Sequence, residues 1–349
     1  MINVCAKAGR ISLAEKILER FVAFSAYLKT ELIDTKEDMT PSVRTWNILL
    51  SSCMIQGDVH RVKQFWLRME KNNIQPDIVS YNTVLKCYAQ SSTARKVKNF
   101  DIQEAVEDLF RRLWHDPNAI PNRITYLAIV NIWINQGLTK RAELFLLDMT
   151  SASLQSTHHT IAYDHNKDIP TPSRGLFHTV LTSWGQHKAP KNAEKLLLKM
   201  AELSDDHDLD VRPNTETYNR LLNCWAKSMK VESGERAEVI LREMEGLGNL
   251  GDDDAIPDIY SYNSVLNAWS NSGDAAALTR IDNLILEMIL KGNPKLLPDL
   301  FTYGTWLKAI ALFDPTDKKR RVEEVVKMMK IHSFKPNEYI REKIRSLMS

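Results

Sequence analysis

Asparagine residues recur along this chain at one place in a repeating block, and an Asp or Asn farther along accompanies most of them. An Asn amide has both a donor and an acceptor, so it can complement the Watson–Crick edge of a pyrimidine, while a neighbouring Asp or Asn fixes its orientation. The seven block openings are Thr45-Trp46-Asn47, Ser80-Tyr81-Asn82, Thr125-Tyr126-Leu127, Leu176-Phe177-His178, Thr217-Tyr218-Asn219, Ser261-Tyr262-Asn263 and Thr302-Tyr303-Gly304. The blocks end in Pro76-Asp77, Pro121-Asn122, Pro172-Ser173, Pro213-Asn214, Pro257-Asp258, Pro298-Asp299 and Pro336-Asn337.

The phase of this repeat can be checked on other residues, because a fixed period determines the architecture. Position one of each repeat is two residues before the Thr, Ser or Leu that begins the block opening, so that the recurring Asn is at position five. Position eleven is then mostly aromatic, which predicts burial between neighbouring repeats. It is occupied by Cys53, Tyr88, Trp133, Trp184, Trp225, Trp269 and Ile310.

Apolar residues within a repeat have helical spacing. In the first full repeat they stand at Val43, Trp46, Leu50 and Cys53, and a second apolar stripe runs over residues 59–69. Gly57-Asp58 separates the two stripes, and a proline closes the repeat. This pattern predicts two antiparallel helices per repeat, which bury their apolar faces only by stacking on neighbouring repeats.

The repeat 43–77 is 35 residues long and, with its Trp46-Asn47 opening and Pro76-Asp77 ending, resembles a pentatricopeptide repeat. The resemblance extends over residues 43–337 and implies an all-α fold: an α-solenoid superhelix of stacked antiparallel helix pairs. One domain is expected over 1–349, and the chain is expected to begin inside a repeat. Its expected parts are a partial repeat 1–42, repeats 43–77, 78–122, 123–173, 174–214, 215–258, 259–299 and 300–337, and a terminal helix 338–349.

The resemblance implies that each repeat reads one RNA base through position five and the last residue of the repeat. Asn with Asp favours uracil, and Asn with Asn favours cytosine or uracil. Leu127 with Ser173, His178 and Gly304 depart from this pattern, so their repeats are expected to read bases loosely or not at all. The expected base-reading residues are Asn47, Asp77, Asn82, Asn122, His178, Asn214, Asn219, Asp258, Asn263, Asp299 and Asn337.

Position two of each repeat is expected to flank the bases. Val79, Ile124, Tyr260 and Phe301 are the expected stacking residues, and the two aromatic rings suit this role best. The other repeats have Arg44, Gly175 and Glu216 there, and a carboxylate is unexpected beside RNA. A structural alternative exists for position five, because Asn also favours places where it caps or links helices.

The formal net charge is only +2, yet the charge is distributed unevenly. Residues 43–122 and the last repeat are basic, whereas acidic residues concentrate in loops at 205–210 and 252–254. A nucleic-acid binder needs cations near phosphate. A small total charge is compatible with a basic groove that has acidic loops outside it.

Motifs of enzymes and of metal or cofactor sites are missing from the sequence. It has no P-loop, no glycine-rich dinucleotide turn and no HExxH. The four cysteines form no CxxC pair, and Cys53, Cys87 and Cys224 are expected in the core. His158, His159 and His165 could bind a metal, but a solvated loop is the simpler reading, so neither a metal nor a cofactor is expected.

The favoured interpretation is therefore a non-catalytic, sequence-selective single-stranded RNA-binding protein with a pyrimidine preference. It would resemble proteins that process, stabilise or permit translation of transcripts in a mitochondrion or plastid, and no membrane association is expected. The alternative is a helical-repeat scaffold that binds proteins or has a fixed place in an organellar ribonucleoprotein. A positive surface around Asn47, Asn82, Asn219 and Asn263 would favour RNA, whereas an acidic or apolar one would favour a protein.

Overall fold

The computed structural model describes residues 1–31, 40–93, 101–157, 171–207, 209–314 and 317–349. Within these ranges every regular element is helical, so the all-α prediction is confirmed there. Besides the α-helices there are two short 3₁₀ segments, Asp253–Ala255 and Pro294–Leu296. The chain divides into two compact units, Met1–Leu176 and Phe177–Ser349.

The start of every repeat counted from the sequence coincides with the first residue of an α-helix. These first helices are α3 (Val43–Gln56), α5 (Ile78–Thr93), α7 (Arg123–Asn135), α9 (Arg174–Gln186), α11 (Thr215–Ser228), α13 (Ile259–Ser272) and α15 (Leu300–Phe313). The second helices are α4 (Val59–Lys71), α6 (Ile102–His115), α8 (Thr139–Thr157), α10 (Pro190–His207), α12 (Ser233–Asn249), α14 (Ala277–Leu290) and α16 (Lys318–Ile331). The chain starts with α1 (Ile2–Lys7) and α2 (Ile11–Glu31) and ends with α17 (Glu338–Met348).

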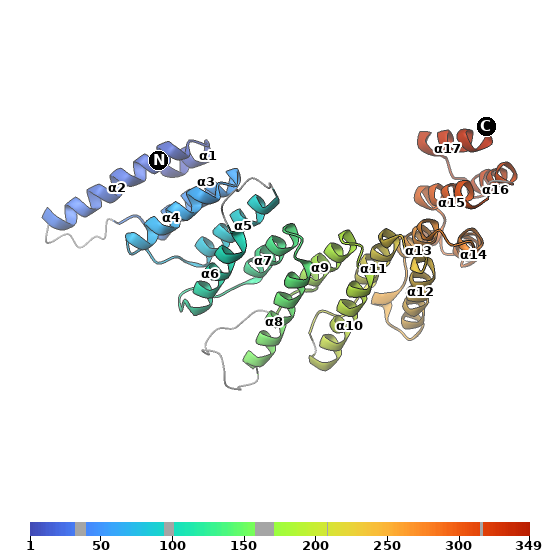
Figure 1. The fold of residues 1–349 in the computed structure, drawn as a ribbon, viewed down its shortest axis with the longest axis horizontal. Coiled ribbons are helices and arrows are strands. Elements are labelled where there is room, and N and C mark those ends of the chain that lie inside the picture. Colours follow the sequence, from blue (N-terminus) through green and yellow to red (C-terminus); the bar gives the residue numbers. More distant parts are fainter. Residues whose placement is uncertain (32–39, 94–100, 158–170, 208, 315–316) are drawn as a thin grey trace. The chain divides into compact units, whose positions relative to one another are not determined.

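In the first unit, the first helices form one row: α1 packs on α3, α3 on α5 and α5 on α7 (Figure 1). Each of them also packs on the second helix that follows it in the chain. Helices α2 and α4 contact the first helix of the next repeat as well. A first helix is therefore covered on several sides, whereas a second helix keeps a larger exposed face.

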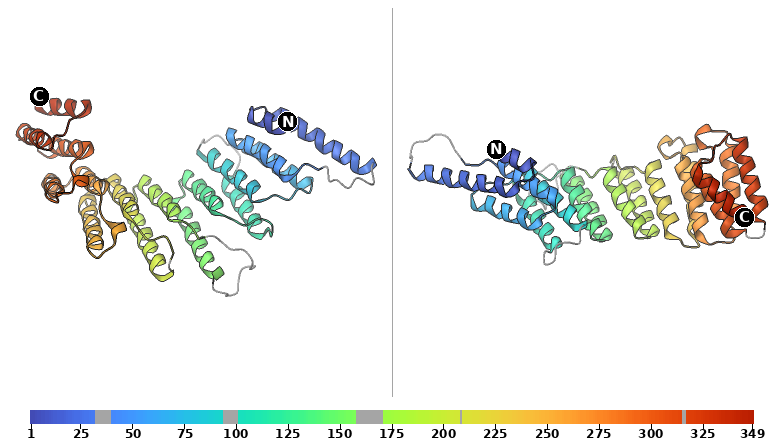
Figure 2. Two further views of the ribbon diagram at one scale, coloured as in Figure 1. Left: turned by 180° about the vertical axis from the view of Figure 1, so that it is seen from behind. Right: turned by 90° about the horizontal axis from the view of Figure 1, so that it is seen from above.

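The second unit repeats this arrangement. Helices α11, α13, α15 and α17 pack in succession, and α10, α12 and α14 each contact the first helix that follows (Figure 2). The boundary between the units falls in the first turn of α9. Helix α17 has the place of a first helix, because it packs on both α15 and α16.

The helix ends follow from local sequence. Gly57 and Gly273 end α3 and α13 with φ of 64° and 71°, a left-handed conformation that glycine adopts without steric cost. Asp58 then caps α4 by accepting a hydrogen bond from the Arg61 amide at 3.0 Å. Pro190 begins α10, since a helix's first turn needs no amide donor there.

Position eleven lies in the core of each repeat, as predicted: all seven side chains are buried. Two of the tryptophans also make polar contacts with the preceding repeat. Trp225 donates its indole N–H to Glu194 at 2.8 Å, and Trp269 donates to Glu238 at 3.0 Å. A Cβ added to Gly234 would stand 2.3 Å from the ring of Trp269, so this glycine permits the helices to approach closely.

Candidate nucleic-acid interface

The last residue of a repeat is the N-cap of the next first helix. Asp258 and Asp299 each accept a hydrogen bond from the backbone amide three residues on, at 2.9 Å, and Ser261 and Thr302 close a capping box with them. Asn122 and Asn214 form the same capping box with Thr125 and Thr217, and Asp77 exchanges the same two bonds with Ser80.

The Asn at position five bonds to this cap. Asn219 donates its Nδ2–H to Asp258 Oδ1 at 3.0 Å, and Ser261 donates its hydroxyl to Asn219 Oδ1 at 2.6 Å. We call this set of bonds the inter-repeat link: position five, the last residue, and the Ser or Thr at position three of the next repeat. The same link joins Asn47, Asp77 and Ser80 (3.0 and 2.6 Å), Asn82, Asn122 and Thr125 (3.2 and 2.7 Å), and Asn263, Asp299 and Thr302 (3.1 and 2.7 Å).

The inter-repeat link gives these asparagines a structural role, because each amide connects two repeats. The link uses one of two N–H groups on Nδ2 and one lone pair on Oδ1, so every Asn keeps a donor and an acceptor. Its bonds reach only Oδ1 of the Asp, which leaves Oδ2 outside the link. Asn47, Asn82 and Asn263 are 8%, 7% and 5% exposed, so little of each residue faces solvent.

Hydrogen bonding also affects ionisation at the cap of α5. Burial alone would raise the pKa of Asp77, but the bonds donated by Asn47 and Ser80 outweigh it and hold the pKa below its ordinary value. The carboxylate is therefore charged at neutral pH. A charged acceptor beside a free amide N–H is a donor–acceptor pair of the kind that a uracil edge complements.

Position two is exposed in all seven repeats, next to these amides. Tyr260 is 69% exposed, and Val79, Ile124 and Phe301 are about half exposed. Apolar and aromatic side chains open to solvent at a fixed register can lie against the faces of unstacked bases. The remaining position-two residues, Arg44, Gly175 and Glu216, are exposed as well.

Three repeats replace the position-five Asn in different ways. His178 keeps part of the link, since its Nε2 lies 2.8 Å from the Thr217 hydroxyl while Asn214 caps that helix. Leu127 is 43% exposed, and the repeat after it has Leu176 at position three. Gly304 has no side chain to link, and the helix after it has Ile340 at position three.

Sequence reasoning did not identify position three as part of the site. The sequence contains a pattern that could have identified it. Position three is Ser or Thr wherever the preceding repeat has Asn or His at position five. It is Leu or Ile where the preceding repeat has Leu or Gly at position five. The hydroxyl hydrogen-bonds to the amide or imidazole at position five, a partner that Leu and Gly cannot offer. The two positions therefore change together in this chain.

Acidic residues are distributed unequally between the two sets of helices, whereas both sets contain basic residues. The first helices α3 to α15 have one acidic residue, and it is neutralised: Glu216 pairs with Arg220 at 2.5 Å. The second helices hold most of the acids, and α10 and α12 alone have eight: Glu194, Glu202, Asp205, Asp206, Glu235, Glu238, Glu243 and Glu245. The same seven first helices have seven basic residues: Arg44, Lys86, Arg123, Arg174, Arg220, Lys227 and Lys308.

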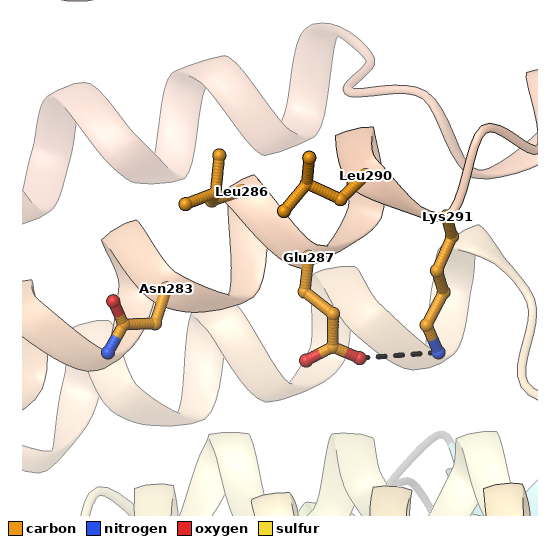
Figure 3. A pocket seen from close by; sticks show the side chains of 5 residues that line it. All are labelled: Asn283, Leu286, Glu287, Leu290 and Lys291. Carbon is orange, nitrogen blue, oxygen red and sulfur yellow. Dashed lines mark ion pairs between the residues drawn. The ribbon is translucent and has the colours of Figure 1, made fainter.

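Two of the surface cavities differ in the residues that line them. In the first unit a cavity of about 630 Å³ is lined by Arg44, Asn47, Asp77 and Val79, which are the expected base-reading and flanking residues of two repeats. A second cavity, of about 330 Å³, lies on α14 in the other unit (Figure 3). It is lined by Asn283, Leu286, Glu287, Leu290 and Lys291, none of which is an expected base reader.

The three cysteines expected in the core lie there. Cys53, Cys87 and Cys224 are buried, and burial raises the pKa of each thiol to about 12. In the described ranges, no group of three or more His, Cys, Asp or Glu could hold a metal ion. No helix in those ranges is both long and apolar enough to cross a membrane. His158, His159 and His165 lie outside the described residues.

Comparison with known proteins identifies the repeat. A model of the PPR repeat family matches residues 41–90, and a PPR repeat model matches residues 1–24. Among the relatives from Arabidopsis thaliana, pentatricopeptide repeat-containing protein At2g35130 is 26% identical over 47% of this chain, and At5g25630 is 22% identical over 55%. These matches cover only 23% and 28% of the two relatives.

Solved structures share the fold. The crystal structure of the maize pentatricopeptide repeat protein PPR10 matches 99% of this chain and 40% of its own, with a TM-score of 0.59 and 18% identity. PPR10 in complex with an 18-nucleotide psaJ RNA element matches with a TM-score of 0.51 and 18% identity. The matched repeats and the relatives named for the same repeat identify pentatricopeptide repeats in this chain, and the solved structures share its helical-repeat fold.

Proposed function

We propose that this chain is a sequence-selective single-stranded RNA-binding protein that catalyses no reaction itself. The observation that carries the proposal is the surface of the first helices, where seven basic residues accompany one neutralised acid. Cations on that surface can contact phosphates. The polar edges of the linked asparagines lie on the same helices, within reach of the bases.

Recognition would combine the two rows of residues described above. Exposed position-two side chains lie against the base faces, and the free N–H of the Asn with Oδ2 of the Asp meets the base edge. Since every linked Asn donates to its cap, the orientation of its amide is already fixed before RNA binds. This preorganisation reduces the entropic cost of reading a base.

The expected site is rich in pyrimidines. With the RNA parallel to the chain, the repeats from 43 to 337 would favour uracil, then cytosine or uracil, two loosely read bases, two uracils and one unselected base. Base selection is opposite Asn47, Asn82, Asn219 and Asn263, the four residues with a complete inter-repeat link. One relative of the chain is named chloroplastic, which supports a role on transcripts of a plastid or mitochondrion.

The proposal is tested by titrating the whole chain with a pyrimidine-rich single-stranded RNA and with the duplex of the same sequence. Affinity for the single strand should exceed that for the duplex, whose base edges are hidden. It should also fall as salt rises. Equal affinity for the two forms, or no binding, would overturn the proposal.

A matched pair of variants locates the RNA. Lys86 on α5 and Lys71 on α4 are both exposed lysines of the first unit, one on a first helix and the other on a second helix. Lys86→Gln should lower the slope of log Kd against log salt by about 0.7, the value for one phosphate on a single strand. Lys71→Gln should leave it unchanged. An equal effect of both would indicate a nonspecific basic surface.

A further inference from the structure

The one acidic residue of the first helices α3 to α15 lies beside a position-five side chain in the second unit. Glu216 is at position two of α11, and its Oε1 is 3.6 Å from Nδ1 of His178, the position-five residue of the preceding repeat. The other ring nitrogen of His178 faces the Thr217 hydroxyl at 2.8 Å. A carboxylate is therefore added to the row of side chains that are expected to face the base edges.

An arginine holds this carboxylate in place. Arg220, one turn further along α11, donates from one guanidinium nitrogen to Glu216 Oε1 at 2.5 Å. It donates from another to the Thr182 hydroxyl of α9 at 2.6 Å, and that hydroxyl donates to the His178 carbonyl at 2.8 Å. Arg220 therefore ties the carboxylate to the helix that contains His178. A side chain that is already held in this way loses little conformational freedom when it binds a ligand.

The carboxylate of Glu216 is accessible to a ligand. Its side chain is 57% exposed. The ion pair with Arg220 offsets its charge, which reduces its repulsion of the phosphates of a nearby strand. The contacts with Arg220 and His178 both involve Oε1, and a carboxylate has about four acceptor sites, so the group can accept further hydrogen bonds.

A group that only accepts hydrogen bonds distinguishes the four bases. Guanine has two adjacent donors on its Watson–Crick edge, the ring N1–H and the N2 amino group, which fit the two oxygens of one carboxylate. Adenine and cytosine present one amino group there beside a ring nitrogen that accepts, and the single N–H of uracil lies between two carbonyl oxygens. A carboxylate therefore favours guanine and disfavours uracil, which is the reverse of the preference expected for an Asn with an Asp.

We propose that Glu216 reads guanine at the base opposite repeat 174–214, and that Arg220 is the residue that positions it. The inference rests on the proposed function and gives a selected base to a repeat that otherwise reads loosely. It also gives a role to a carboxylate that is unexpected beside RNA. The fourth nucleotide of the expected site becomes guanine, between a loosely read base and the two uracils.

The test titrates the whole chain with four RNA probes that differ only at the fourth nucleotide of the expected site. Guanine should bind more tightly than uracil there, on the order of tenfold. Glu216→Gln replaces one acceptor oxygen by a donor and should abolish this preference, while the uracil preference at the fifth nucleotide stays unchanged. Glu235→Gln removes the same charge from an exposed residue of α12, the second helix of that repeat, and should keep the guanine preference.

Inosine at the fourth nucleotide identifies the atoms involved, because it lacks the amino group of guanine. The wild type should bind the inosine probe several-fold more weakly than the guanine probe, whereas Glu216→Gln should not distinguish the two. Arg220→Gln should reduce the guanine preference without changing the preference at the fifth nucleotide, and an unchanged guanine preference would overturn the positioning role.

The failure of the inference and the failure of the proposed function give different results. Binding of single-stranded RNA without a guanine preference at the fourth nucleotide would overturn the inference and leave the proposed function intact. The same guanine preference in the wild type and in Glu216→Gln would do so as well. Failure of the wild type to bind any single-stranded RNA would instead overturn the proposed function.

Discussion

The two faces of α15 differ sharply, although both meet a first-helix neighbour. Toward α13, Asn263, Asp299 and Thr302 form the inter-repeat link, and the cap is a complete capping box. Toward α17 the link is absent, because Gly304 stands in place of the Asn and Ile340 in place of the Ser or Thr. Asn337 still caps α17 by accepting a hydrogen bond from the Ile340 amide at 3.0 Å. The polar edge that could read a base is therefore also a structural connection. At Gly304, where the link is absent, Lys343 of α17 donates a hydrogen bond to the backbone carbonyl.

The comparison is tested most strongly by removing the cap on each side. Asp299→Ala takes away an N-cap, which costs about 0.5–2 kcal/mol, and leaves the Asn263 amide unpaired in the interior, which costs about 1–3 kcal/mol more. We expect a total loss of about 2–4 kcal/mol in the free energy of unfolding, measured in urea by tryptophan fluorescence. Asn337→Ala, the matched variant, should cost only about 1 kcal/mol. Equal losses would show that the link adds nothing to the cap.

A second prediction separates reading from linking at Asn263. By family resemblance, Asn263→Thr with Asp299 retained should shift the preferred base at that repeat from uracil towards guanine. A lost match should cost about 1–3 kcal/mol of binding free energy. Titrations against probes that differ only at that base measure the shift. An unchanged preference, together with a lowered stability, would mean that Asn263 only links repeats and would favour the scaffold alternative.

The helix pairs could be predicted because their signals are local and repeat. The residue at position eleven, the glycines that end helices and the closing prolines are local signals, because each of them concerns one turn of one helix. The first helices start at the residues where the repeats counted from the sequence begin. The inter-repeat link was harder, because it joins side chains about 30 to 40 residues apart, such as Asn47 and Asp77 or Asn82 and Asn122. The sequence shows that both residues recur but not that they bond to each other.

The interface at α17 could not be predicted from the pattern at all. The sequence predicts the terminal helix that contains Lys343 and Tyr339, but not the contacts of that helix with α15. Its register on α15 depends on how Ile340 packs beside Gly304, which is a tertiary contact. The sequence shows which repeat lacks the Asn, but not that Lys343 bonds to the backbone there.

A smaller effect concerns the glycine itself. A Cβ on Gly304 would lie 3.5 Å from Ile340 Cδ1, an ordinary contact, so Gly304→Ala should fit. Because glycine is unfavourable inside a helix, the variant should gain up to about 1 kcal/mol in unfolding free energy. Gly234→Ala is the opposite case, since its Cβ would stand 2.3 Å from Trp269, and overpacking should cost about 1–3 kcal/mol. A loss at Gly304 would mean that the interface needs the open space.

The smallest effect concerns pH, at the link between α3 and α5. The pKa of Asp77 is held below its ordinary value because the hydrogen bonds from Asn47 and Ser80 outweigh burial. A depressed carboxyl pKa stabilises the fold above the unfolded pKa, 3.8, and this contribution is lost as pH falls through the folded pKa. Asp77→Asn keeps a capping side chain, as Asn122 does for α7, but cannot titrate. Between pH 5 and pH 3 the variant should therefore lose less unfolding free energy than the wild type. An equal loss in urea titrations at the two pH values would show that the Asp77 charge does not strengthen the link.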